Sequence, residues 1–174
     1  MPTYLLDKNV VRRTIEGIAR AQRGEPPRLD QAACLTLLHA GSQDRFTAYI
    51  TPQTLHILER LTARNEVRDF LDEVEVVQVG RYVRRWARRL REHGFTGEDA
   101  VVLSLGTFGT DLAGGILGVD AVVTLDLPFI NNFYTHHATL DRRLRAITQQ
   151  LLVPFQHARL PELWQPTKAL AELP

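Results

Sequence analysis

VDAVVTLD, residues Val119–Asp126, is a short apolar run that ends at a carboxylate. A run this short and this rich in β-branched residues predicts a strand that is buried on both faces, as in a parallel sheet. Asp126 then falls at the carboxyl end of that strand. Because open α/β sheets bind their ligands outside this edge, we expect the functional site of the protein there.

The remaining segments alternate between strand-like and helix-like patterns. The other predicted strands are Thr3–Asp7, Arg45–Ile50 and Val74–Val79. The predicted helices are Val10–Ala21, Leu29–Ala40, the segment that starts at Thr51-Pro52, Asn65–Leu71, Gly80–His93, the segment that starts at Glu98-Asp99, and Thr135–Leu152. This alternation predicts an α/β fold with a mostly parallel central sheet and helices on its faces.

A chain of 174 residues is expected to form a single domain. Its core would span about residues 1–133, and residues 134–174 would form a helical C-terminal extension. Glycines crowd the segment Gly106–Gly118, which predicts either an interrupted helix or an inserted loop before the Val119 strand.

Composition excludes several classes of protein. A single cysteine, Cys34, excludes an intramolecular disulfide and a cysteine-based zinc site. No apolar stretch approaches the ~20 residues that span a bilayer, and the N-terminus lacks the apolar run of a signal peptide, so we expect a cytoplasmic protein with no membrane contact. Neither a Gly-x-Ser-x-Gly motif nor a P-loop is present, so nothing supports a triad hydrolase or a P-loop nucleotidase.

The formal net charge of +1 does not by itself indicate a nucleic-acid partner. Every basic residue except Lys8 and Lys168 is an arginine, however. Arginine binds phosphate groups bidentately, which makes this bias compatible with contact to RNA or DNA. A GC-rich genome or a thermophilic host would produce the same bias, so both interpretations stay open.

Four acidic residues stand at notable positions in the predicted elements. Asp7 and Asp126 end strands, Asp99 starts a helix, and Glu59 lies in the helix after the second strand. Each has an ordinary interpretation as a helix cap, a turn residue or one half of a surface ion pair. Their order along the chain carries more information than any one of them.

In that order the chain resembles the PIN-domain nucleases, which include the VapC-type toxins of toxin–antitoxin systems. The resemblance covers about Tyr4 to Phe129 and is carried by LLDKNV, ITPQTLHILERL, GEDAVVLSL and VVTLDLPF. Family members carry an acid that closes the first strand, a glutamate on the following helix, an Asp-Ala helix start and a Thr-x-Asp after the last core strand. The resemblance implies a three-layer α/β/α fold with a mostly parallel central sheet.

The resemblance also implies a ribonuclease that uses Mg²⁺ or Mn²⁺. The implied catalytic acids are Asp7, Glu59, Asp99 and Asp126, of which Asp7, Asp99 and Asp126 would ligate the metal, with Asn9 and Thr124 as supporting polar groups and Asp111 as an alternative acid. Oxygen donors suit these ions, and clustered carboxylates repel one another unless a cation is bound.

The segment Arg81–Arg91, RYVRRWARRLR, is the most basic part of the chain. On a helix its apolar residues recur every four positions, and the arginines occupy the remaining surface. Arg84, Arg85 and Arg88 are candidates for contact with RNA phosphates. An ordinary amphipathic helix with a solvated arginine face, or a face for a protein partner, are the alternatives.

The partners implied by the resemblance are RNA, an antitoxin protein if the chain is a toxin, and a second copy in a homodimer. The main alternative function is a catalytically weak PIN-like protein-interaction module. A receiver- or flavodoxin-like regulatory domain is a third interpretation. Four acids favour the enzyme, because an inactive module does not need carboxylates that repel one another.

Overall fold

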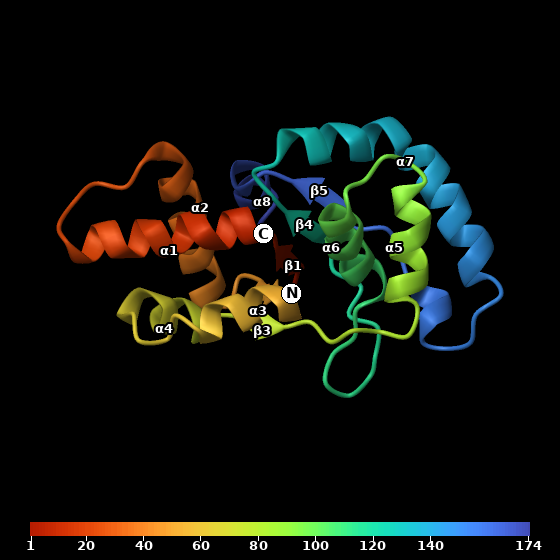
Figure 1. The fold of residues 1–174 in the computed structure, drawn as a ribbon, viewed down its shortest axis with the longest axis horizontal. Coiled ribbons are helices and arrows are strands. Elements are labelled where there is room, and N and C mark those ends of the chain that lie inside the picture. Colours follow the sequence, from red (N-terminus) through yellow and green to blue (C-terminus); the bar gives the residue numbers. More distant parts are fainter.

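Five short strands form one sheet in the order β3-β2-β1-β4-β5, and every neighbouring pair is parallel (Figure 1). The computed structural model describes the whole chain, Met1–Pro174. The strands are β1 (Thr3–Leu6), β2 (Thr47–Ile50), β3 (Glu75–Val76), β4 (Ala121–Val123) and β5 (Glu162–Trp164). The predicted α/β fold is confirmed, and its sheet is parallel throughout rather than mostly parallel.

Eight α-helices accompany the strands. They are α1 (Lys8–Gln22), α2 (Leu29–Ser42), α3 (Pro52–Glu59), α4 (Asn65–Leu71), α5 (Val83–Arg91), α6 (Gly97–Phe108), α7 (Leu127–Thr148) and α8 (Pro166–Ala171). A single 3-10 turn, Phe155–His157, precedes β5. No helix combines the length and the apolar character that crossing a bilayer requires.

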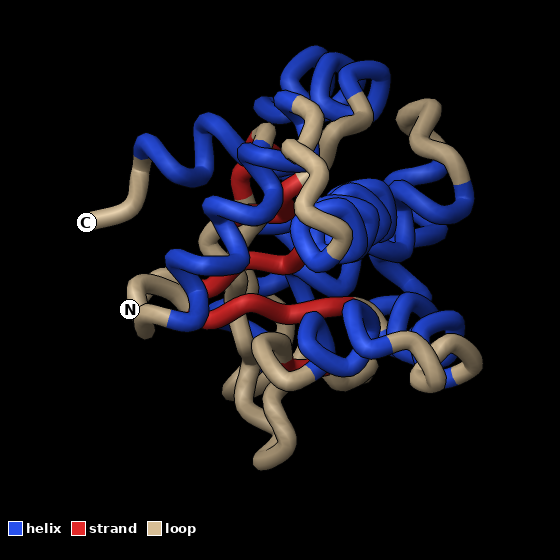
Figure 2. The backbone as a smooth tube through the Cα atoms, turned by 90° about the vertical axis from the view of Figure 1, so that its left-hand side faces the viewer, coloured by secondary structure: helices blue, strands red, loops and turns tan.

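The helices cover both faces of the sheet, because alternate residues of a strand point to opposite faces. Leu5 of β1 and Val122 of β4 pack into a core with α5, α6 and α7. Tyr4 and Leu6 of β1 and Val123 of β4 pack into a second core with α1, α2, α3, α4 and α8. The strands therefore lie between two helical layers, as Figures 1 and 2 show, which confirms the three-layer arrangement.

The β4 region agrees with its predicted burial, but the helix after it starts earlier than predicted. All three residues of β4 are fully buried. Asp126 then caps α7, since its Oδ1 accepts the backbone N–H of Phe129 at 3.0 Å. The prediction that this helix begins at Thr135 is wrong, because the aspartate cap and the proline in the first turn already start it at Leu127.

The segment before β4 is an inserted loop, one of the two predicted alternatives. α6 continues to Phe108, and a loop then leads to β4. Gly80 packs directly against the end of α6, where an added Cβ would lie 1.9 Å from the carbonyl oxygen of Phe108. Only glycine allows this close approach.

Residues 134–174, which the sequence predicts to be helical, also contain a strand. They supply most of α7, the edge strand β5 and α8. β5 pairs with β4 in parallel register, and α8 packs against α2. This part of the chain therefore completes one edge of the sheet.

Leu5 tests the assignment of the core. It is completely buried in the central strand of the sheet. We predict that Leu5→Ala lowers the free energy of unfolding by about 2–5 kcal/mol in denaturant titration, because it leaves a cavity in a packed core. The matched control is Leu112→Ala in the exposed loop after α6, which should change that free energy by less than about 0.5 kcal/mol. Equal losses in the two variants would contradict the assignment.

Candidate active site at the carboxyl edge of the sheet

Asp7 lies at the carboxyl end of β1, where its side chain caps α1. Its backbone N–H donates to the carbonyl of Val123 at 2.9 Å and extends the β1–β4 pairing by one residue. Oδ1 accepts the backbone N–H of Lys8 at 2.7 Å, and Oδ2 accepts the hydroxyl of Thr124 at 2.7 Å. Only 5% of Asp7 is exposed, so this edge of the sheet holds a buried carboxyl group with a donor on each oxygen.

The Thr124 hydroxyl connects Asp7 to two further predicted site residues. Its oxygen accepts from Nδ2 of Asn9 at 3.2 Å and from the backbone N–H of Asp126 at 3.1 Å. Oδ1 of Asn9 accepts the backbone N–H of Leu125 at 3.0 Å, which holds the amide in place. Since two N–H groups donate to the Thr124 oxygen, its own proton is directed at Asp7. These polar groups form one network across the ends of β1 and β4.

The environment of Asp7 disfavours its charged form. Burial raises the pKa of Asp7 above its ordinary value of 3.8, although the hydrogen bonds from Thr124 and Lys8 lower it. The negative charges of Glu98 and Asp99 raise this pKa further. An ionised Asp7 is therefore destabilised, and a bound cation would relieve both the burial and the repulsion.

The start of α6 supplies these two neighbouring acids. Oγ1 of Thr96 accepts the backbone N–H of Asp99 at 3.1 Å and fixes the first turn of the helix. Glu98 forms an ion pair with Lys8, the residue after Asp7. Acidic side chains are favourable at a helix N-terminus, so the helix itself stabilises negative charge at this position.

A cavity of about 300 Å³ opens beside Asp7. It lies between the ends of β1 and β2 and the helices α3, α5 and α6. Its polar and charged lining residues are Asp7, Lys8, Thr51, Gln53, Thr54, Arg84 and Glu98. The cavity therefore combines acids with two cationic side chains, Lys8 from α1 and Arg84 from α5.

Glu59, predicted to belong to the acid set, lies outside this cavity. It is exposed at the end of α3, and its carboxylate lies 3.9 Å from Nδ1 of His56. The residues of α3 that line the cavity include Thr54 and Ile57. Glu59 is two residues beyond Ile57, which turns it by about 200° around the helix axis.

Asp126 and Asp111 also lie outside the lining of the cavity. Asp126 contacts the Thr124 hydroxyl through its backbone N–H, but its carboxylate caps α7. Asp111 lies in the loop after α6, where its carboxylate accepts the backbone N–H of Gly115 at 2.9 Å. Asp99 does not line the cavity either, but among the predicted acids it is the one whose charge raises the pKa of Asp7.

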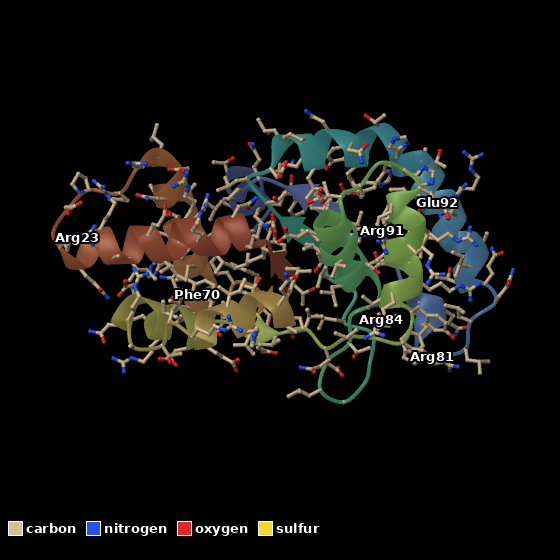
Figure 3. All side chains as sticks on the ribbon, in the orientation of Figure 1. Arg23, Phe70, Arg81, Arg84, Arg91 and Glu92 are labelled. Carbon is tan, nitrogen blue, oxygen red and sulfur yellow. The ribbon has the colours of Figure 1, made fainter.

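The three arginines predicted to contact RNA point to different places. Arg84 lines the cavity beside Asp7, and Figure 3 labels it on α5. Arg85 borders a separate small crevice with Trp86, and Arg88 is exposed to solvent. Of these three arginines, only Arg84 could contact a phosphate group that is bound beside Asp7.

The donor set suits a divalent cation that keeps part of its water shell. No three His, Cys, Asp or Glu side chains are close enough together to hold a metal ion. Mg²⁺, however, is commonly bound through one or two carboxylates, with water and substrate phosphate completing its ligands. Each carboxylate oxygen has two lone pairs, so Asp7 can still ligate a cation while it accepts its two hydrogen bonds. Asp7 together with Glu98 or Asp99 fits this pattern.

Sequence reasoning missed Lys8 and Glu98. Each is adjacent in sequence to a residue that it did select, since Lys8 follows Asp7 and Glu98 precedes Asp99. The sequence does show opposite charges at the start of α1 and the start of α6. That these two charges form an ion pair depends on the tertiary structure, which brings the two helix starts together.

Comparison of the chain with protein-family models, with curated proteins and with solved structures gives no match. The fold class and the arrangement around Asp7 are therefore the observations from which a function is inferred.

The raised pKa of Asp7 predicts how stability depends on pH. Because the folded-state pKa is raised, folding favours the protonated acid, and Asp7 destabilises the protein progressively as pH rises from about 3.8 through the folded-state value. Asp7→Asn removes this titration. We predict that the free energy of unfolding of the wild type, minus that of Asp7→Asn, falls as pH rises, by at most about 1.4 kcal/mol per pH unit.

The measurement is denaturant titration of both proteins across this pH range in a chelator. A difference that stays constant or grows with pH would contradict the raised pKa. If Asp7 ligates Mg²⁺, the ion added near neutral pH should stabilise the wild type and leave Asp7→Asn unchanged, because the variant lacks the carboxylate.

Thr124 tests the polar network. Thr124→Val keeps the shape of the side chain but removes the hydroxyl, and it leaves a buried oxygen of Asp7 without its donor. We predict a loss of about 1–3 kcal/mol in the free energy of unfolding. Thr124→Ser retains the hydroxyl and should keep the pH dependence of the wild type. An unchanged pH dependence in Thr124→Val would show that the hydrogen bond does not control Asp7.

Proposed function

We propose that the protein is a metal-dependent ribonuclease with a PIN-like fold, which hydrolyses RNA phosphodiester bonds at the Asp7 cavity. The observation that supports this proposal most is the buried Asp7 carboxyl group, which faces a cavity with Glu98 and Arg84 at the carboxyl edge of a parallel sheet. Buried acids with perturbed pKa values are concentrated at functional sites. The resemblance of LLDKNV, GEDAVVLSL and VVTLDLPF to PIN-domain nucleases supports the same activity.

The residues of the cavity have separate roles in this proposal. Asp7 and one of the α6 acids, Glu98 or Asp99, hold Mg²⁺ or Mn²⁺. A bound divalent cation supplies stabilisation of the charge on the reacting phosphate and activation of the attacking water. Thr124 orients Asp7 through its hydroxyl. Arg84 binds a phosphate oxygen from the opposite wall of the cavity.

Lys8 has a role that depends on substrate. In the structure its ammonium group pairs with Glu98. When RNA binds, the Lys8 ammonium group can leave Glu98 and pair with a phosphate oxygen instead. Glu98 is then free to bind the cation. Before RNA and metal bind, Lys8 neutralises the negative charge of Glu98.

The main alternative is a PIN-like protein-interaction module that binds metal weakly or not at all. Two observations favour it: the absence of a group of three metal-binding side chains, and the Lys8–Glu98 ion pair beside Asp7. A fixed ammonium group can neutralise the site without metal. The two functions predict opposite results for metal binding.

The test is calorimetric titration with Mn²⁺, run beside cleavage of a labelled single-stranded RNA. We predict that the wild type binds Mn²⁺ and cleaves RNA, that Asp7→Asn reduces cleavage by at least about 100-fold, and that one of Glu98→Gln and Asp99→Asn does the same. Glu59→Gln is the matched control, because it removes an acid that lies outside the cavity and is not among the charges that raise the pKa of Asp7. It should retain cleavage within about threefold of the wild type.

A wild type that neither binds Mn²⁺ nor cleaves RNA would reject the nuclease and favour the interaction module. Loss of cleavage in Glu59→Gln would instead reject the cavity as the place of the reaction. The same resemblance extends the proposal to a toxin with an antitoxin partner and to a homodimer, which co-purification from the native host and light scattering would test.

A further inference from the structure

A second cleft, of about 360 Å³, lies along α1 beyond its first turn. The charged residues that line this arginine cleft are Arg13, Arg20, Arg23, Arg28, Arg64 and Glu16. Arg13 and Arg20 lie on α1 and Arg23 follows its last residue, while Arg28 precedes α2 and Arg64 precedes α4. Three separate segments of the chain therefore line one cleft with five arginines and Glu16, and Asp30, Glu25 and Glu66 pair with four of these arginines from beside the cleft.

The spacing of the charged residues along α1 explains why they share the cleft. Arg13, Glu16, Arg20 and Arg23 follow one another at intervals of three and four residues, which places them on one face of a helix. Arg23 lies at the outer end of α1 in Figure 3, whereas Arg84 lies on α5. The arginine cleft is therefore separate from the Asp7 cavity, and the two share no lining residue.

Acidic neighbours hold the inner arginines in place. The Arg13 guanidinium lies 2.7 Å from Glu16 and 2.8 Å from Asp30, and Arg20 lies 3.4 Å from Glu25. Less than a third of the side chain of Arg13 or Arg20 is exposed. Ion pairs and partial burial therefore hold the side chains of Arg13 and Arg20 in place.

The outer arginines, Arg23, Arg28 and Arg64, have guanidinium N–H groups that no carboxylate accepts. Arg23 contacts Glu25 at 2.9 Å and Arg64 contacts Glu66 at 2.6 Å, while Arg28 has no ion pair. A guanidinium carries five N–H donors, and a single carboxylate satisfies only one or two of them. The donors that remain in the cleft match the geometry of phosphate oxygens, which arginine binds bidentately.

We infer that the arginine cleft binds phosphate groups, and that these belong to the backbone of the RNA strand bound at the Asp7 cavity. This inference rests on the proposed RNA substrate. α1 links the two sites, because Asp7 caps its first turn and Arg20 lies in its last turn. By the helical rise the two positions are about 20 Å apart along the axis, so an extended strand of several nucleotides is needed to reach both. The cleft anchors the strand and leaves the chemistry to the cavity.

The test is fluorescence anisotropy with a labelled single-stranded RNA in EDTA, where cleavage cannot occur. Arg23→Gln and Arg28→Gln should each weaken RNA binding roughly fivefold and reduce the slope of log affinity against log salt by about 0.7, as for one lost phosphate contact. Arg142→Gln on α7 is the matched control, since it removes an exposed arginine that also has no ion pair. It should leave the affinity and the slope unchanged. Thermal unfolding of each variant confirms that the fold is retained.

Equal effects of Arg28→Gln and Arg142→Gln would overturn the inference and reduce the cleft to a solvated arginine surface. Titration with inorganic phosphate and with AMP forms a second arm. Suppose that substitution of Arg23 or Arg28 weakens the binding of phosphate and AMP but does not change the affinity for RNA. The ligand of the cleft is then a free phosphate or phosphate ester, and the RNA assignment is overturned.

The outcome is separable from that of the proposed function, which cleavage reports. RNA binding that needs Arg28 in a protein that does not cleave would support the cleft and reject the nuclease. If Asp7→Asn abolishes cleavage but Arg23→Gln and Arg28→Gln do not change the affinity for RNA, the nuclease is supported and RNA binding at the cleft is rejected.

Discussion

The hydrogen bond from the Thr124 hydroxyl to the Asp7 carboxyl group joins β1 and β4 at the edge where the proposed chemistry takes place. Two helices begin from the same point. Asp7 caps α1, and the backbone N–H of Asp126, the residue that caps α7, donates to the Thr124 oxygen. Parallel strands bring such residues together because all their carboxyl ends meet at one edge. The directions of α1 and α7 and the position of Asp7 are therefore set by one polar network.

A structural cap alone does not explain the acids around this network. An N-cap is satisfied by serine, threonine or asparagine, none of which carries a buried charge. Burial and the nearby charges of Glu98 and Asp99 make the ionised form of Asp7 unfavourable. Proteins retain such local conflicts mainly where function requires them. Binding a cation is a function that would require a carboxylate. Lys8 partly replaces the positive charge of such a cation, because its ammonium group pairs with Glu98.

Residues at strand ends could be predicted from sequence, whereas residues on helix faces could not. Asp7, Asn9 and Thr124 follow short apolar strands, and they meet because these two strands, β1 and β4, are neighbours in a parallel sheet. Glu59 depends on the rotation of α3, and the residues of that helix that face the cavity include Thr54 and Ile57. A sequence pattern that fixes the start of a helix within one or two residues leaves the direction of a given side chain uncertain by 100–200°, at about 100° per residue.

Three other features of the structure have only weak or distant signals in the sequence. The start of α7 depends on a cap and a proline, both visible in the sequence, but its apolar pattern is clear only further along the chain. β5 is only three residues long, follows an irregular segment and lies just before α8, so it is too short to show any periodicity. The arginine cleft gathers side chains from three segments that are distant in sequence, so only the packing of α1, α2 and α4 brings them together.

The most direct test of the central claim is an anomalous diffraction map of crystals soaked in Mn²⁺. If Asp7 is a metal ligand, an anomalous peak should lie within about 2.5 Å of an Asp7 oxygen, with a further oxygen from Glu98 or Asp99 or their bound water. The peak should be absent from crystals of Asp7→Asn. A wild-type map with no peak in the cavity, and with Lys8 still paired to Glu98, would contradict the claim that this carboxyl group is a metal ligand.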